Sequence, residues 1–117
     1  MRAEIKCLLT PDIDPESYVP EDPECFMFLV QLIAGPAGEP GEESFCFEVC
    51  SAGWLRARAR QEGPITGRHH VVVDRFDWPA LVAYFDGLVT GCGGADWHEV
   101  TAKLSRYGLW EFEDYRA

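Results

Sequence analysis

The sequence predicts an α+β fold, in which a mostly antiparallel sheet of about four strands carries helices packed on it. Strand-like patterns occupy residues 2–9, 25–34 and 43–50, and three strands in succession favour antiparallel pairing. Apolar residues at helical spacing then fill much of residues 77–107. The 117 residues are 47% hydrophobic and contain no internal repeat, which predicts one domain spanning residues 1–117. The predicted order is strand, strand, strand, helix, strand, helix, helix.

Residues 2–9 form the first predicted strand, because apolar and charged residues alternate along them. This alternation places Ala3, Ile5 and Cys7 on one face and the charged side chains on the other. Residues 10–24 carry four prolines among acidic residues, and they therefore form a long, locally stiff loop. A loop of this length in a small domain is often functional.

The second and third predicted strands form a hairpin. Residues 25–34 are an almost continuous apolar run, which predicts a central strand covered on both faces. Residues 35–41 are rich in glycine and proline and form a turn. Residues 43–50 then alternate, with Phe45, Phe47 and Val49 predicted to face inward.

A short helix and a fourth strand follow the hairpin. Ser51 is a suitable N-cap for a helix that ends at Gly63 and Pro64. The fourth strand is predicted within residues 68–76, around three consecutive valines.

Two further helices are predicted from their caps. Asp77 caps the first, which has Pro79 in its first turn, and Asp96 with Glu99 has the spacing of a capping box for the second. Gly108 fits a left-handed helix stop. The predicted buried residues are Leu81, Val82, Phe85, Leu88 and Val89 in the first helix, and Trp97, Val100, Leu104 and Tyr107 in the second. The tail, residues 109–115, alternates large apolar and acidic residues and is predicted to pack back as an extended segment.

The net charge of −10 comes from one segment of the chain. Between Cys7 and Leu55 there are ten acidic residues and no lysine or arginine, whereas the rest of the chain balances. Such a field repels nucleic acid and anionic membranes and attracts basic partners. The acidic loop and turn therefore give the predicted partner-binding residues, which are Asp12, Asp14, Glu16, Glu21, Asp22, Glu24, Glu39, Glu42 and Glu43. The alternative is that these side chains are solvated and only keep the protein soluble.

The cysteines and the N-terminus indicate a cytoplasmic protein. The five cysteines are an odd number without a CxxC pair, which is typical of reduced thiols. Cys46 and Cys50 are about 13 Å apart along a strand, too far to form a disulfide. The first residues do not resemble a secretory signal, and no apolar run is long enough to span a membrane.

The sequence contains no convincing catalytic, metal or cofactor site. His69 and His70 are adjacent on a predicted strand and point to opposite faces, so they cannot easily share a metal ion. Cys46 and Cys50 have no neighbouring base that would activate a thiol. The arginines at 56, 58 and 60 spread around a helix axis and do not form a nucleic-acid-binding stripe. We therefore predict a protein that is not an enzyme and needs no cofactor.

Short motifs run along nearly the whole chain. They are MRAEIK (1–6), PEDP (20–23), GEESF (41–45), EVC (48–50), WL (54–55), GRHH (67–70), KLSR (103–106), Gly108 and WEFEDY (110–115). In their order and spacing they resemble the immunity protein 8 family of bacterial polymorphic toxin systems. Residues 51–53 depart from the proline-containing helix start expected there, which affects helix initiation only.

The resemblance implies a protein that binds and neutralises a cognate toxin domain, without catalysis. It carries over no catalytic residues and no toxin-contact residues to this chain. The alternative is another small acidic domain for protein–protein interaction or regulation. Neither the toxin nor the oligomeric state follows from the sequence.

Overall fold

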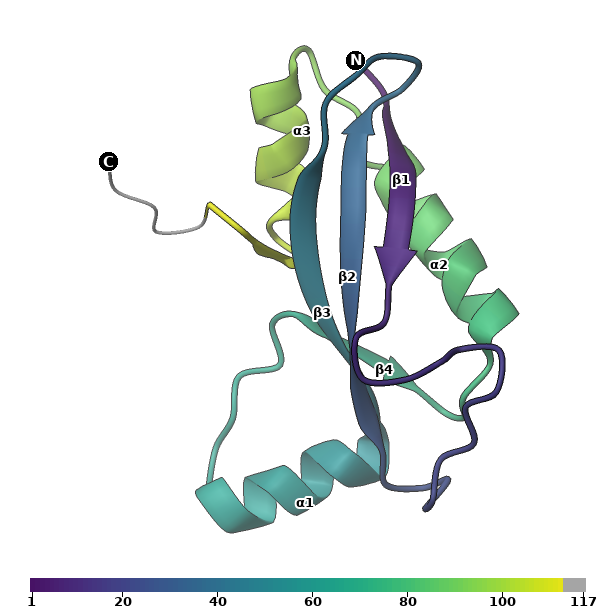
Figure 1. Cartoon of the computed structure of the whole chain (residues 1–117). Helices are drawn as coiled ribbons and strands as arrows, with labels where there is room; N and C mark the ends of the chain where they lie inside the picture. Colours follow the sequence, from purple (N-terminus) through teal and green to yellow (C-terminus); the bar gives the residue numbers. More distant parts are fainter. Residues whose placement is uncertain (113–117) are drawn as a thin grey trace.

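The computed structural model describes residues 1–112 (Figure 1). The elements are β1 (Ala3–Leu9), β2 (Met27–Pro36), β3 (Glu43–Ser51), α1 (Ala52–Glu62), β4 (His70–Val73), α2 (Trp78–Thr90), α3 (Trp97–Leu104) and β5 (Leu109–Trp110). Their order confirms the predicted α+β fold and its sequence of strands and helices.

The strands form one sheet in the order β1-β2-β3-β4, and β5 pairs with β3. The pairs β1–β2, β2–β3 and β3–β5 are antiparallel, so the predicted mostly antiparallel sheet is confirmed. β3 and β4 are parallel. Helix α1 and residues 63–69 form the crossover between them, because a parallel partner requires the chain to return to the same end of the sheet.

The core lies between the β2–β3 hairpin and the helices α2 and α3, which cover one face of the sheet (Figure 1). The fully buried side chains include Phe28, Val30, Leu32, Phe45, Phe47, Val49, Phe85, Val89, Val100 and Leu104. The inward positions predicted for β3 are therefore confirmed. The expectation that β2 is covered on both faces is wrong, since Leu29, Gln31 and Ile33 on its other face are only half-buried.

A β-bulge in β1 changes the alternation predicted from the sequence. The pairing with β2 shifts register between Ile5 and Cys7. A bulge inserts one extra residue and so moves the following side chains to the opposite face. As a result Cys7 is exposed, and Leu8 packs against the core together with Ile5.

The three predicted helix caps are present. Ser51 accepts from the Trp54 amide, Asp77 accepts from the Ala80 amide, and Asp96 accepts from the Glu99 amide. Two side chains of the predicted helical faces are exposed instead of buried, namely Val82 and Tyr107. Each helix covers the sheet with a narrower face than the apolar pattern indicated, because only the residues directly over the sheet lose contact with solvent.

Gly108 serves close packing and not a left-handed helix stop. Within residues 1–112 the glycines with a positive φ are Gly38, Gly41 and Gly63, and Gly108 is not one of them. A Cβ atom at Gly108 would lie 2.7 Å from the ring of Phe47. The glycine therefore allows the chain after α3 to approach β3, where Leu109 and Trp110 form β5. The predicted extended tail is confirmed for these two residues, whereas residues 111–112 form a turn and Phe112 is exposed. Tyr115 lies outside the described residues.

Candidate functional site

The predicted acidic residues fall into two groups at opposite ends of the sheet (Figure 1). The loop between β1 and β2 carries Asp12, Asp14, Glu16, Glu21, Asp22 and Glu24, all of which are exposed. The turn between β2 and β3 carries Glu39 and Glu42, and Glu43 is the first residue of β3 directly after it. The ten residues of β2 separate the two groups by roughly 30 Å. The structure thus brings together the acids within each group, and it keeps the two groups apart.

The acidic loop is held in place by side chains at several points. Asp12 Oδ2 accepts from the Leu29 amide at 3.1 Å, which ties the start of the loop to β2. Asp14 and Asp22 each accept from the amide two residues on, at 3.0 and 2.9 Å. The ring of Tyr18 packs edge-on against Phe76, with their centroids 4.8 Å apart. The loop therefore presents its exposed carboxylates from an ordered backbone.

In the acidic turn, Glu39 and Glu42 are exposed and Glu43 is half-buried. Burial raises the pKa of the Glu43 carboxyl, and the indole groups of Trp97 and Trp110 lower it in part. Within residues 1–112, one Glu43 oxygen and the Trp110 indole nitrogen are buried without a hydrogen bond of normal geometry. Glu43 thus differs from its neighbours because its charge lies at the edge of the core.

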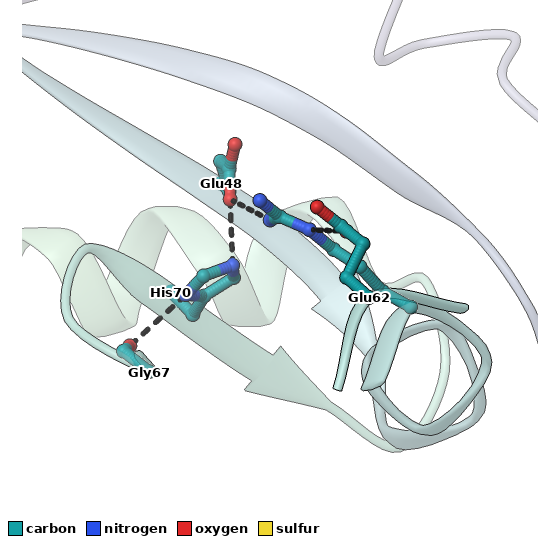
Figure 2. A network of polar contacts seen from close by, with 5 residues as sticks. Glu48, Glu62, Gly67 and His70 are labelled. Carbon is teal, nitrogen blue, oxygen red and sulfur yellow. Dashed lines mark hydrogen bonds and ion pairs between the residues drawn. The ribbon is translucent and has the colours of Figure 1, made fainter. Parts of the chain in front are cut away.

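A second polar site, which was not predicted from the sequence, is built around Glu48, whose neighbours Phe47 and Val49 in β3 point into the core (Figure 2). The carboxylate of Glu48 lies 2.6 Å from His70 Nε2 and 3.6 Å from the Arg58 guanidinium. Arg58 Nε also donates to Glu62 at 2.7 Å, and His70 Nδ1 lies 3.0 Å from the Gly67 carbonyl oxygen. Both ring nitrogens of His70 therefore face oxygen atoms that can only accept a hydrogen bond.

A cleft of about 610 Å³ lies between β3, α1 and the segment that leads into β4, and its lining includes Glu48, Arg58, Glu62 and His70. His69, which directly precedes β4, has a φ of 70°. This left-handed conformation is uncommon for residues other than glycine. The signal that could have revealed the site is the parallel register, which sets Glu48 opposite His70. The sequence pattern does not reveal that β4 pairs with β3 in parallel, so the contact between Glu48 and His70 was not predicted.

Cys50, near the end of β3, does not line this cleft. Burial raises the pKa of the Cys50 thiol to about 11, and the charge of Glu48 adds to this effect, so the reactive thiolate is scarce at neutral pH. Within residues 1–112, no group of three or more His, Cys, Asp or Glu side chains could hold a metal ion. No helix in this part of the chain combines the length and apolar character needed to cross a membrane.

One mixed sheet, two helices behind it and acidic groups at both ends define a small acidic α+β protein whose charged features lie at its surface. The chain belongs to the immunity protein 8 family, whose model matches residues 3–115. Comparisons with curated proteins and with solved structures gave no match. The family predicted from the sequence motifs is confirmed.

Proposed function

We propose that this chain is an immunity protein that binds and neutralises a cognate bacterial toxin domain in the cytoplasm, without catalysis. The observation that carries the proposal is membership of the immunity protein 8 family over residues 3–115. The acidic surface supports it, because an acidic field favours association with a basic partner. A toxin domain that acts on nucleic acid has such a basic surface, and carboxylates on an ordered loop can take the place of phosphates.

The experiment that tests this proposal is to sequence the genes that flank this chain for a toxin domain and to co-express the two. Growth should be rescued by the chain, and the two proteins should purify together at a fixed ratio. Growth arrest despite full expression of the folded chain would contradict the proposal. Rescue without a complex would contradict the part of it that excludes catalysis, since inhibition by binding requires a complex.

We further propose that the acidic loop, and less so the acidic turn, faces the toxin. Loops on a rigid scaffold are common binding sites, and this loop carries six exposed acids on an ordered backbone. Charge complementarity acts mainly on the association rate, and salt screens it beyond a Debye length of about 8 Å.

The test of this surface replaces Asp14, Glu16, Glu21 and Asp22 by their amides. Asp12 is left unchanged because it anchors the loop to β2. Asparagine at 14 and 22 keeps the side-chain oxygen that accepts from the backbone. The association rate should fall and lose most of its salt dependence. The comparison variant changes Glu39 and Glu42 at the far end of the sheet, which removes two charges instead of four. An effect about half as large would show that only net charge matters.

A further inference from the structure

The two edges of the sheet are protected to different degrees. At one edge, β1 contains the charged residues Glu4 and Lys6 and the bulge after Ile5. Charges and bulges are the usual devices that keep a sheet edge from pairing with another chain. At the other edge, β4 has the sequence His-Val-Val-Val, without proline, bulge or ionised carboxylate. Within residues 1–112, β4 pairs with β3 alone, and its outer side is open.

The pairing with β3 fixes which backbone groups face the open side. The Glu48 amide donates to the His69 carbonyl oxygen at 2.8 Å. In a parallel pair, alternate residues direct both backbone groups to the neighbouring strand. The odd-numbered residues of β4 therefore face β3, and the even-numbered residues face outward. The His70 amide turns back to the Gly67 carbonyl at 3.1 Å, so the open edge consists chiefly of the amide and carbonyl of Val72.

A groove of about 390 Å³ runs along this open edge, with α2 as its wall. All four residues of β4 line the groove, together with residues of α2 that include Leu81 and Tyr84. The side chains of Val72 and Tyr84 are 53% and 49% exposed, although both are largely apolar. An open strand edge beside an apolar groove is the arrangement that binds an extended peptide by strand addition.

The end of the groove joins the acidic loop. Asp74, Arg75 and Asp77 line the groove, and Arg75 and Asp77 also line a second hollow together with Glu16 of the loop. The single arginine does not offset the three acids that line these hollows with it, namely Asp74, Asp77 and Glu16. A segment lying in the groove would therefore meet a negative field where it leaves β4.

We propose that β4 binds an extended segment of the toxin, which adds to the sheet as a further strand beside Val72. The segment places an apolar side chain in the groove next to Tyr84 and basic side chains towards Asp74 and Asp77. This inference rests on the proposed function and deepens it, since it names the backbone edge as the part of the chain that holds the toxin.

The test uses Val72→Pro in the full chain. Proline removes the amide that faces outward and leaves the pairing with β3 intact, as proline is tolerated at the outer side of an edge strand. The dissociation constant for the toxin domain should rise by at least about tenfold, through loss of a backbone hydrogen bond and a clash with the added strand. The conservative variant Val72→Thr keeps the amide and the branched side chain, and its dissociation constant for the toxin domain should equal that of the unaltered chain.

A second measurement does not depend on the folding of the proline variant. Hydrogen exchange at the Val72 amide of the unaltered chain should slow when the toxin domain is bound. Binding that leaves this exchange unchanged, or a folded Val72→Pro variant that binds as tightly as the unaltered chain, would overturn the inference but leave the proposed function intact. If the unaltered chain does not bind the toxin at all, both proposals fail. Protection of Val72 by a second copy of this chain, seen as concentration-dependent dimers without toxin, would overturn the assignment to the toxin.

Discussion

The His70 imidazole and the Glu48 carboxylate lie 2.6 Å apart across the parallel pair of β3 and β4. The His70 side chain is almost fully buried, whereas that of Glu48 is 33% exposed, so solvent weakens this interaction only in part. It joins the short strand β4 to the centre of the sheet and fixes the start of the open edge.

Replacement of Glu48 by glutamine should lower the free energy of unfolding by about 0.5 to 1.5 kcal/mol, because His70 loses a charged partner. Urea unfolding of the two proteins measures the difference. The matched variant is Glu62→Gln, whose carboxylate pairs with Arg58 at the surface and whose loss should leave stability within error. Equal effects of the two changes would contradict a special role for the Glu48–His70 contact.

Alanine at Gly108 should destabilise the fold by about 1 to 3 kcal/mol, since its Cβ would meet the ring of Phe47 in a packed core. Thermal or urea unfolding measures this loss. Gly87→Ala is the matched change: it lies in α2 with no atom within 4 Å of the new Cβ, and it should stabilise the protein slightly. A neutral Gly108→Ala variant would show that β5 can move away from β3.

The stability of the chain should decrease with rising pH through the titration of Glu43. Burial raises the pKa of this carboxyl in the folded state, so between the unfolded and folded values the folded state binds more protons. The free energy of unfolding therefore falls across that window, which begins near the unfolded value of about 4.3. Glu43→Gln cannot titrate at this position, so its free energy of unfolding should rise relative to that of the unaltered chain between acid and neutral pH. If Glu42→Gln showed a larger relative rise than Glu43→Gln, the pH dependence could not be assigned to Glu43.

All five thiols should be free and should differ in reactivity. The structure forms no disulfide among the cysteines, all of which lie in the part of the chain it describes. Cys7 and Cys25 are exposed and should react first, and Cys46 more slowly. Burial raises the pKa of Cys50 and Cys92, which should react only after unfolding. A titration in denaturant without reductant that finds fewer than five thiols would contradict this prediction.

Local patterns in the sequence identified most of the elements. The caps at Ser51, Asp77 and Asp96 act within three residues, and the alternation of β3 reflects burial on one face, so both can be read from neighbouring residues. The bulge in β1 and the close approach at Gly108 depend on contacts with distant residues. No local pattern carries that information.

Only part of the candidate site could be predicted from the sequence. The excess of acids before Leu55 was evident, but their separation to the two ends of β2 follows from the hairpin. The contact between Glu48 and His70 depends on the parallel register of β4, which a crossover through α1 creates. The charge composition therefore indicated a basic partner. The tertiary structure was needed to locate the separate surfaces at which such a partner can bind.

The unequal protection of the sheet edges limits what this protein can assemble into. Fibres grow from strands only when every molecule offers two edges that accept a neighbour. The bulge and charges of β1 hinder strand addition at one edge. At the other edge, within residues 1–112, the open strands are β4 and the two-residue β5, each of which pairs with β3 alone. A chain that adds to β4, as proposed above, therefore finds no equally open strand on the β1 side from which a fibre could continue.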